Sequence, residues 1–124
     1  MIIEMIYDKY EGNIQLHKPF DCNAIDIALD ESLKNILGRS NGIEETMLNP
    51  KTNEVIIIGW IVYPYDEIYK ETAYYKENYG IDGIVFSDDG AGNPYYLLDG
   101  KVYQFNEIDE ESEFVADSLE DFFE

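Results

Sequence analysis

The chain has 124 residues, enough for one ordinary domain and too few for two. Eight Lys and Arg residues against 27 Asp and Glu residues give a formal net charge of −19. This charge repels nucleic-acid phosphates and anionic lipid, so it argues against nucleic-acid and membrane-surface binding. It suits a basic protein partner, but it also keeps a protein soluble, so the charge alone leaves both interpretations open.

Cysteine usage and the N-terminal residues bear on the cellular compartment. Cys22 is the only cysteine, so no intrachain disulfide can form, as is typical of a reducing compartment. The apolar segment 1–6 is short and lacks the basic start and cleavage site of a signal peptide. No apolar run approaches the length of a membrane span. We therefore expect a cytoplasmic protein.

The N-terminal third gives one clear helix. In residues 1–20, the apolar residues from Ile2 to Ile6 fit either one face of a short helix or the start of a strand, and Lys18–Pro19–Phe20 breaks the regular pattern. From Ile25 to Leu37, apolar residues recur at spacings of three and four and predict a helix. The helix should stop at Gly38 or at the Asn41–Gly42 pair, because these residues tolerate positive φ. Ile43 begins a short strand.

The middle of the chain predicts a strand and a helix. A turn-like segment, 48–53, precedes the most apolar stretch, Val55 to Tyr63, which is rich in β-branched residues. This stretch predicts a central strand covered on both faces, ended by Pro64. Asp66 is placed to cap a helix that runs to Tyr79 and stops at Gly80.

The C-terminal third predicts strands followed by a short helix. Asp99–Gly100 lies between two β-prone runs and is a strong hairpin signal, because both turn residues need positive φ. Asp117 or Ser118 should cap a terminal helix. The remaining expected segments are a strand over 83–86, a loop over 87–94, hairpin strands over 95–98 and 101–105, and a last strand over 113–116.

Residues with catalytic or metal-binding chemistry are sparse. His17 has no obvious carboxylate or nucleophile spaced around it, which favours a surface or half-buried histidine over a catalytic one. His17 and Cys22 together are too few ligands for zinc, and Cys22 is interpreted as a small core residue. We therefore expect no enzyme activity, metal or cofactor.

Two acidic segments remain. Asp88–Asp89–Gly90 resembles part of a calcium loop, but it lacks the alternate ligands and the distal Glu, so a solvated turn fits better. Gly90 and Gly92 lead into a strand rather than a helix, which argues against a nucleotide site. The run from Glu107 to Glu113 is either a solvated loop or an electrostatic patch for a basic partner.

Four segments, in this order and spacing, resemble the SUKH superfamily of Smi/Knr-type domains. They are Leu33–Leu37 with Asn41–Ile43, Tyr75–Val85, Asp89–Tyr96 and Val115–Phe123. The resemblance implies a single α+β domain over residues 1–124, in which a central, mostly antiparallel sheet is flanked by helices and residues 1–24 stay undefined.

The same resemblance implies a function. Bacterial members of the superfamily are regarded as immunity proteins that neutralise toxins, often nucleases, in polymorphic-toxin systems. A basic toxin domain is therefore the expected partner, bound by a monomer or weak dimer. The alternative is an intracellular regulatory or scaffold module that binds other proteins, as the fungal relatives suggest.

Tyrosines and the acidic segments are the candidate partner-binding residues. Tyrosine is enriched at the energetic centres of interfaces, and carboxylates attract a basic partner. For each tyrosine, including Tyr63 and Tyr96, packing in the core is the competing interpretation. The residues predicted to bind the partner are Tyr65, Asp88, Asp89, Tyr95, Glu107, Asp109, Glu110, Glu111 and Glu113.

Overall fold

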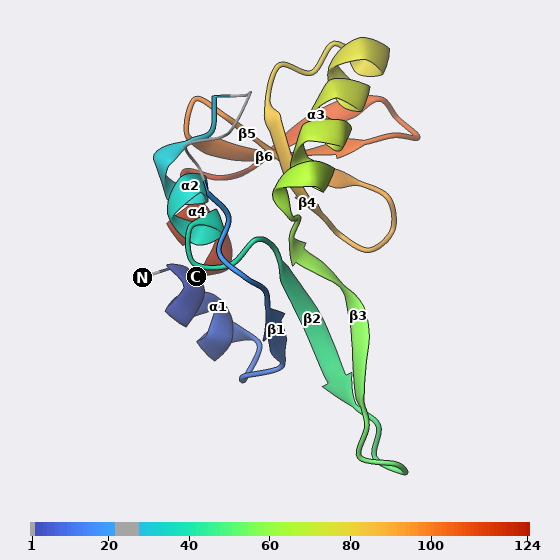
Figure 1. The fold of residues 1–124 in the computed structure, drawn as a ribbon. Helices are drawn as coiled ribbons and strands as arrows, with labels where there is room; N and C mark the ends of the chain where they lie inside the picture. The colour runs from blue at the N-terminus through green and yellow to red at the C-terminus, as the bar shows by residue number, and fades with distance from the viewer. Residues whose placement is uncertain (1, 22–27) are drawn as a thin grey trace.

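The computed structural model describes residues 2–21 and 28–124. In this part of the chain, four helices accompany two antiparallel sheets, with strand orders β1-β2-β3 and β4-β5-β6-β7 (Figure 1). The elements are α1 (Ile2–Lys9), β1 (Ile14–Leu16), α2 (Glu31–Leu37), β2 (Ile43–Leu48), β3 (Val55–Val62), α3 (Tyr65–Tyr79), β4 (Ile84–Asp88), β5 (Pro94–Leu98), β6 (Lys101–Asn106), β7 (Glu111–Ala116) and α4 (Leu119–Phe123). The α+β class is confirmed, although the strands divide into two sheets.

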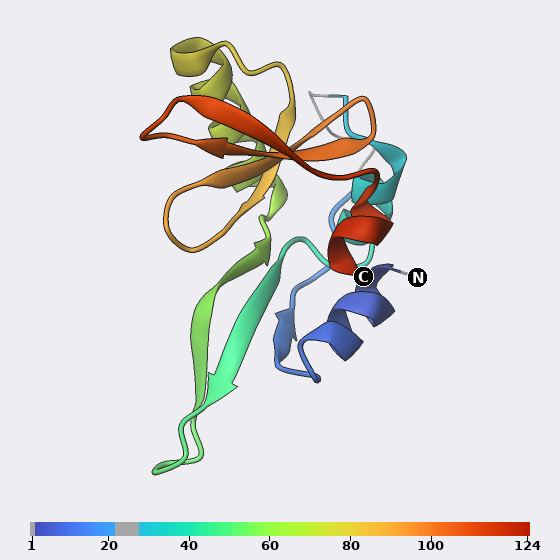
Figure 2. The same cartoon turned by 180° about the vertical axis from the view of Figure 1, so that it is seen from behind.

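The N-terminal segment, which the sequence left open, forms a helix followed by a short strand. Ile2, Ile3 and Ile6 share one face of α1 and are buried, consistent with their spacing of three and four. Helix α1 packs against α4, as the view from behind shows (Figure 2). Because α4 also buries Leu119 and Phe123, both ends of the chain contribute to the core. β1 pairs with β2.

Helix α2 is shorter than predicted. It begins at Glu31, because the carboxylate of Asp30 accepts a hydrogen bond from the Ser32 N–H at 2.9 Å and caps the first turn. It ends at Gly38, one of the two predicted stops. The predicted start at Ile25 and the predicted core residue Cys22 lie outside the described residues.

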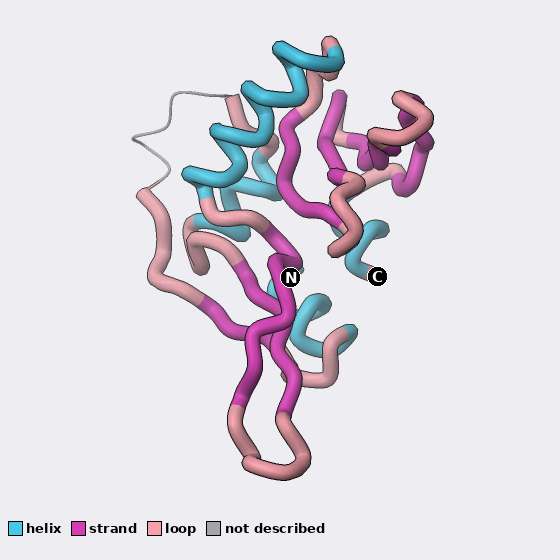
Figure 3. The backbone as a smooth tube through the Cα atoms, turned by 90° about the vertical axis from the view of Figure 1, so that its right-hand side faces the viewer, coloured by secondary structure: helices cyan, strands magenta, loops and turns pink. Residues whose placement is uncertain are grey.

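β3 is a strand as predicted, but the prediction that other elements cover both of its faces is wrong. β3 is not a central strand but the edge of the three-stranded sheet. Its first four residues are exposed, from Val55 at 65 % to Ile58 at 52 %, and burial begins only at Ile61. The β2–β3 hairpin extends away from the helices and from the second sheet (Figures 1 and 3). Continuous apolar residues predicted the strand correctly, but they carry no information on which elements cover it.

Most of the predicted turns and helix ends are confirmed. Helix α3 ends at Gly80 in the left-handed conformation, with φ of 71°. Asp99 and Gly100 have φ of 54° and 79° and join β5 to β6. Helix α3 begins one residue before Asp66, with Pro64 at the capping position, so the predicted side-chain cap is wrong. None of the helices in residues 2–21 and 28–124 is long and apolar enough to cross a bilayer.

Candidate functional site

Three of the predicted binding residues, Asp88, Asp89 and Tyr95, meet at the β4–β5 loop. One Asp88 oxygen accepts the Gly90 N–H at 2.7 Å, and one Asp89 oxygen accepts the Ala91 N–H at 2.8 Å. The carboxylates thus hold the loop through its own backbone, as Asp does in turns. Partial burial raises the pKa of Asp89, but hydrogen bonds from Ala91, Asn93 and Gln104 outweigh it and hold the pKa below its ordinary value.

The second oxygen of Asp88 binds a buried tyrosine. The Tyr63 hydroxyl donates to it at 2.5 Å. Burial and this hydrogen bond to a carboxylate raise the pKa of Tyr63. Tyr63 therefore keeps its proton and fixes the orientation of Asp88 from beneath. Its burial fits the competing interpretation, that Tyr63 is a packed core residue.

A matching pair joins α3 to the β6–β7 turn. The Tyr75 hydroxyl donates to a Glu107 oxygen at 2.8 Å, and burial and this bond raise the pKa of Tyr75. Between the two pairs lies Glu71, one turn before Tyr75 on α3. Partial burial and the carboxylates of Glu67, Asp88 and Glu107 raise the pKa of Glu71, with Lys70 acting against them.

These carboxylates lie close enough to one another to interact electrostatically. Burial is the largest cause of the raised pKa of Tyr95, and the carboxylates of Asp89 and Asp88 raise it further. Burial likewise raises the pKa of Tyr79, and the carboxylates of Glu107 and Glu110 add to that shift. Each tyrosine thus lies near two neighbouring carboxylates, and Glu71 links the two sets. We call the surface formed by five carboxylates the acidic band: Glu71, Asp88, Asp89, Glu107 and Glu110.

The remaining predicted carboxylates, Asp109, Glu111 and Glu113, lie beside one end of the acidic band. They are exposed on and after the β6–β7 turn. The Asn106 side chain accepts hydrogen bonds from the Ile108 and Asp109 N–H groups and organises the turn, which leaves Ile108 exposed. The turn is therefore a solvated acidic projection.

Tyr65 does not join these residues. It is only 8 % exposed, and its ring stacks on Phe20 with the centroids 4.6 Å apart. A buried ring offers little contact area to a partner. Its burial therefore does not fit the prediction that Tyr65 binds a partner.

The structure adds residues that the sequence analysis missed. A groove of about 370 Å³ lies between β3 and the β4–β5 loop. Its walls include Glu45, Ile58 and Trp60 on one side and Asp88, Asp89 and Tyr95 on the other. The groove joins the exposed part of β3 to one end of the acidic band. Glu71 was missed as well, although its spacing of four from Glu67 and Tyr75 on a predicted helix places all three on one face.

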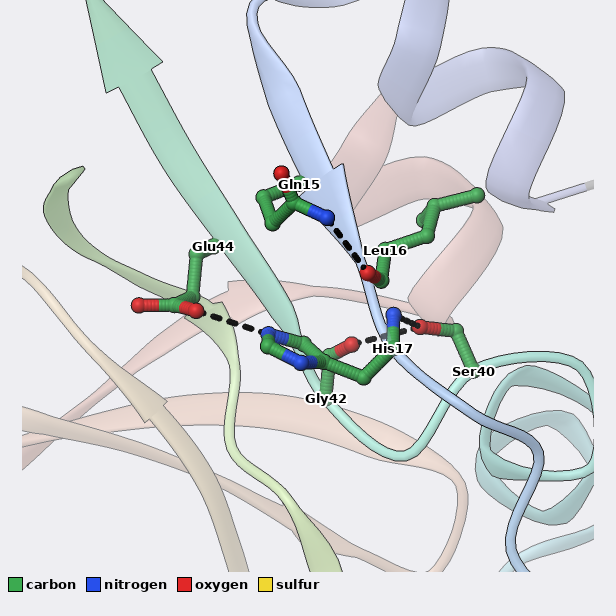
Figure 4. A network of polar contacts seen from close by, with 6 residues as sticks. All are labelled: Gln15, Leu16, His17, Ser40, Gly42 and Glu44. Atoms are coloured by element: carbon green, nitrogen blue, oxygen red, sulfur yellow. Dashed lines mark hydrogen bonds and ion pairs between the residues drawn. The ribbon is translucent and has the colours of Figure 1, made fainter. Parts of the chain in front are cut away.

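His17 belongs to a network that ties β1 to the start of β2 (Figure 4). Its N–H donates to the Ser40 hydroxyl at 2.8 Å, and that hydroxyl donates to the Gly42 carbonyl at 2.6 Å. The ring Nε2 lies 2.7 Å from a Glu44 oxygen. All of these contacts join neighbouring segments of one sheet, so they give His17 a structural role.

The fold and these residues agree with one family. A family model described as SMI1 / KNR4 family (SUKH-1) matches residues 23–124. Searches of curated proteins and of solved structures find no match to the chain. The matched region contains the acidic band and most residues that line the groove, but not Lys9 and Tyr10, which also line it. The chain belongs to the SMI1/KNR4 family (SUKH-1).

Proposed function

We propose that this protein is an immunity protein that binds and neutralises a basic toxin domain, a nuclease, through the acidic band. The acidic band is the observation that carries the proposal, because its five carboxylates lie within electrostatic reach of their neighbours in the band. Family membership supports it, since bacterial proteins that this chain resembles are regarded as immunity proteins. A family alone does not fix function, so the surface must carry the argument.

Charge makes the acidic band suited to rapid capture. A net charge of −19 draws a cationic protein from a distance, and electrostatic steering raises association rates well above those of neutral pairs. An immunity protein gains from speed, because it must reach the toxin before the toxin reaches its substrate. Hydrogen bonds from Tyr63 and Tyr75 orient two of the carboxylates before the partner arrives, which lowers the entropy cost of binding.

A nuclease is the toxin class that fits this surface. Nucleases hold a polyanion with Lys and Arg, and a carboxylate surface offers the same cations an alternative anion. The complex should therefore exclude nucleic acid from the toxin. This protein itself, with 27 acidic residues against eight basic ones, should not bind nucleic acid.

The test pairs growth protection with binding. The partner is the protein encoded beside the gene for this chain, produced with and without this protein, and growth and affinity are both measured. In the double variant Glu71→Gln/Glu107→Gln, we expect affinity to fall about tenfold or more, because two charges leave the interface while side-chain shape is kept.

The control variant removes the same charge elsewhere. Asp8→Asn/Asp99→Asn neutralises two exposed carboxylates on α1 and on the β5–β6 turn, outside the acidic band. It should protect growth and bind as the natural sequence does. Equal losses in both double variants, or no complex at all, would contradict the proposal.

A further inference from the structure

The outer side of β3 has an open hydrogen-bonding edge. Sheet order places β2 on one side of β3, and no strand in residues 2–21 and 28–124 pairs with its other side over Val55 to Trp60. Beyond this stretch, the chain hydrogen-bonds to β4, where the Tyr63 N–H donates to the Phe86 carbonyl at 2.8 Å. Along a β-strand, alternate residues direct their N–H and C=O groups to the same side, so this edge offers a row of donors and acceptors.

The other sheet edges in the described part of the chain are protected. β1 is three residues long, and β7 carries the exposed carboxylates of Glu111 and Glu113. The outer side of β4 is occupied in part by Tyr63 and by the Thr72 hydroxyl, which accepts the Val85 N–H at 3.0 Å. β3 is eight residues long and has neither charge nor proline. Its pairing with β2 is irregular next to Ile58 and Ile61, but Val55 to Ile57 pair in regular register. Natural proteins normally protect such an edge against pairing, so its exposure indicates a pairing site.

We propose that the free edge of β3 binds an extended segment of the partner as an added strand, with the segment's Lys or Arg residues lying in the groove. This inference rests on the proposed function for the identity of the partner. Strand addition supplies affinity through main-chain hydrogen bonds and specificity through alternate side chains. The stretch from Val55 to Trp60 offers about 20 Å of edge.

The two ends of this edge differ in chemistry, which defines the segment. At the hairpin end, the exposed side chains of Val55, Ile56 and Ile57 call for apolar partner residues. At the other end, β3 runs into the groove, which is lined by three acidic residues, Glu45, Asp88 and Asp89, and by one basic residue, Lys9. The Lys9 ammonium donates to the Phe122 carbonyl at 3.4 Å, so the groove keeps an excess of negative charge. Lys or Arg side chains of the partner would complement these three carboxylates, while its apolar side chains would cover the hairpin end.

A second copy of this chain is a poorer occupant. Two copies would each bring a net charge of −19, and repulsion between them opposes pairing. The exposed apolar side chains alone do not distinguish a partner from a second copy, but the acidic groove does. Self-association is therefore an outcome that the test must separate.

The first test uses the complex with the neighbouring gene's product. We expect the backbone amides of Val55 to Trp60 that face the free edge to exchange with deuterium at least about tenfold more slowly in the complex. A complex that depends on Glu71 and Glu107 but leaves these amides unchanged would overturn strand addition while the proposed function stands.

The second test needs no toxin. The probe is a synthetic peptide of about twelve residues in which Val and Thr alternate before a lysine-rich end. Trp60, the only tryptophan, lines the groove and reports binding by its fluorescence. We expect saturable binding of this peptide, and at least about tenfold weaker binding when glutamates replace its lysines.

Two matched variants locate the site. Ile58→Lys places a charge on the exposed edge and should weaken peptide binding about tenfold, whereas Val115→Lys places the same charge on exposed β7 and should leave binding unchanged.

Equal binding of both peptides, or equal losses in both variants, would overturn the proposal. So would sedimentation showing a stable dimer that Ile58→Lys dissociates, because a second copy would then occupy the edge. Peptide binding at β3 without any toxin complex would leave the edge site standing and overturn the toxin-neutralising role.

Discussion

At the scale of single residues, tyrosine hydroxyls organise the carboxylates of the acidic band. Tyr63 and Tyr75 lie beneath the surface, and each donates one hydrogen bond outward, to Asp88 and to Glu107. Each carboxylate keeps acceptor capacity for a partner, because an ionised carboxylate accepts about four hydrogen bonds. The buried tyrosines thus act on binding through the orientation of their neighbours rather than through contact of their own.

Gly83 gives a prediction at this scale. A Cβ atom at Gly83 would clash with the Tyr96 ring and lie 2.8 Å from the Leu97 carbonyl oxygen, which belongs to the backbone and cannot move aside. Gly83→Ala should therefore lower the free energy of unfolding by roughly 1–3 kcal/mol, measured by urea denaturation.

Gly59 is the matched control, because a Cβ atom there meets nothing within 4 Å. Gly59→Ala should be neutral or stabilise the protein by up to about 1 kcal/mol. If both alanine variants lost the same stability, close packing at Gly83 would not be the cause.

The sequence could identify only part of the site at this scale. Asp88 and Asp89 stood out because Asp and Gly mark turns, and the 107–113 run stood out by charge. Glu71 did not, because its raised pKa comes first from burial, and because Asp88 and Glu107, which raise it further, are distant in sequence. Tyr65 was chosen for its residue type, but its contact with Phe20 is also a tertiary one.

At the scale of elements, the sequence predicted where helices end and turns form better than it predicted which elements pack together. The Asp99–Gly100 turn and the Gly80 helix stop depend on φ preferences of the residues themselves, and both were predicted. The placement of β3 depends on which other elements cover it, and eight apolar residues do not specify that. Helix α1 escaped assignment because its few apolar positions fit both the helical and the strand period.

The cap of α4 gives a prediction for an element. The Ser118 hydroxyl accepts the Asp121 N–H at 3.0 Å, and α4 buries Leu119 and Phe123 against the core. Ser118→Ala should cost about 1 kcal/mol of unfolding free energy, because the first turn loses its side-chain acceptor. Ser118→Asp keeps an acceptor and should stay within a few tenths of a kcal/mol of the natural protein. Equal stability of all three proteins in urea would show that the cap contributes nothing.

At the scale of the whole molecule, the excess of carboxylates sets the pH dependence. Partial burial and neighbouring carboxylates raise the pKa of Glu71 above its ordinary value of 4.5. The folded protein therefore takes up this proton at higher pH than the unfolded chain does, so Glu71 makes stability rise as the pH falls through its raised pKa towards 4.5. Glu71→Gln should be more stable than the natural protein at pH 7 and show a smaller gain on acidification, measured by thermal denaturation. Identical pH profiles would contradict this origin.

The central claim, that the acidic band captures a basic partner, is tested most directly by the association rate as a function of salt. Stopped-flow mixing of this protein with the neighbouring gene's product should give a rate that falls steeply with ionic strength, because salt screens attraction at distances beyond about 10 Å. The slope should flatten in Glu71→Gln/Glu107→Gln and persist in Asp8→Asn/Asp99→Asn. A rate independent of salt, or equal flattening in both variants, would contradict the claim.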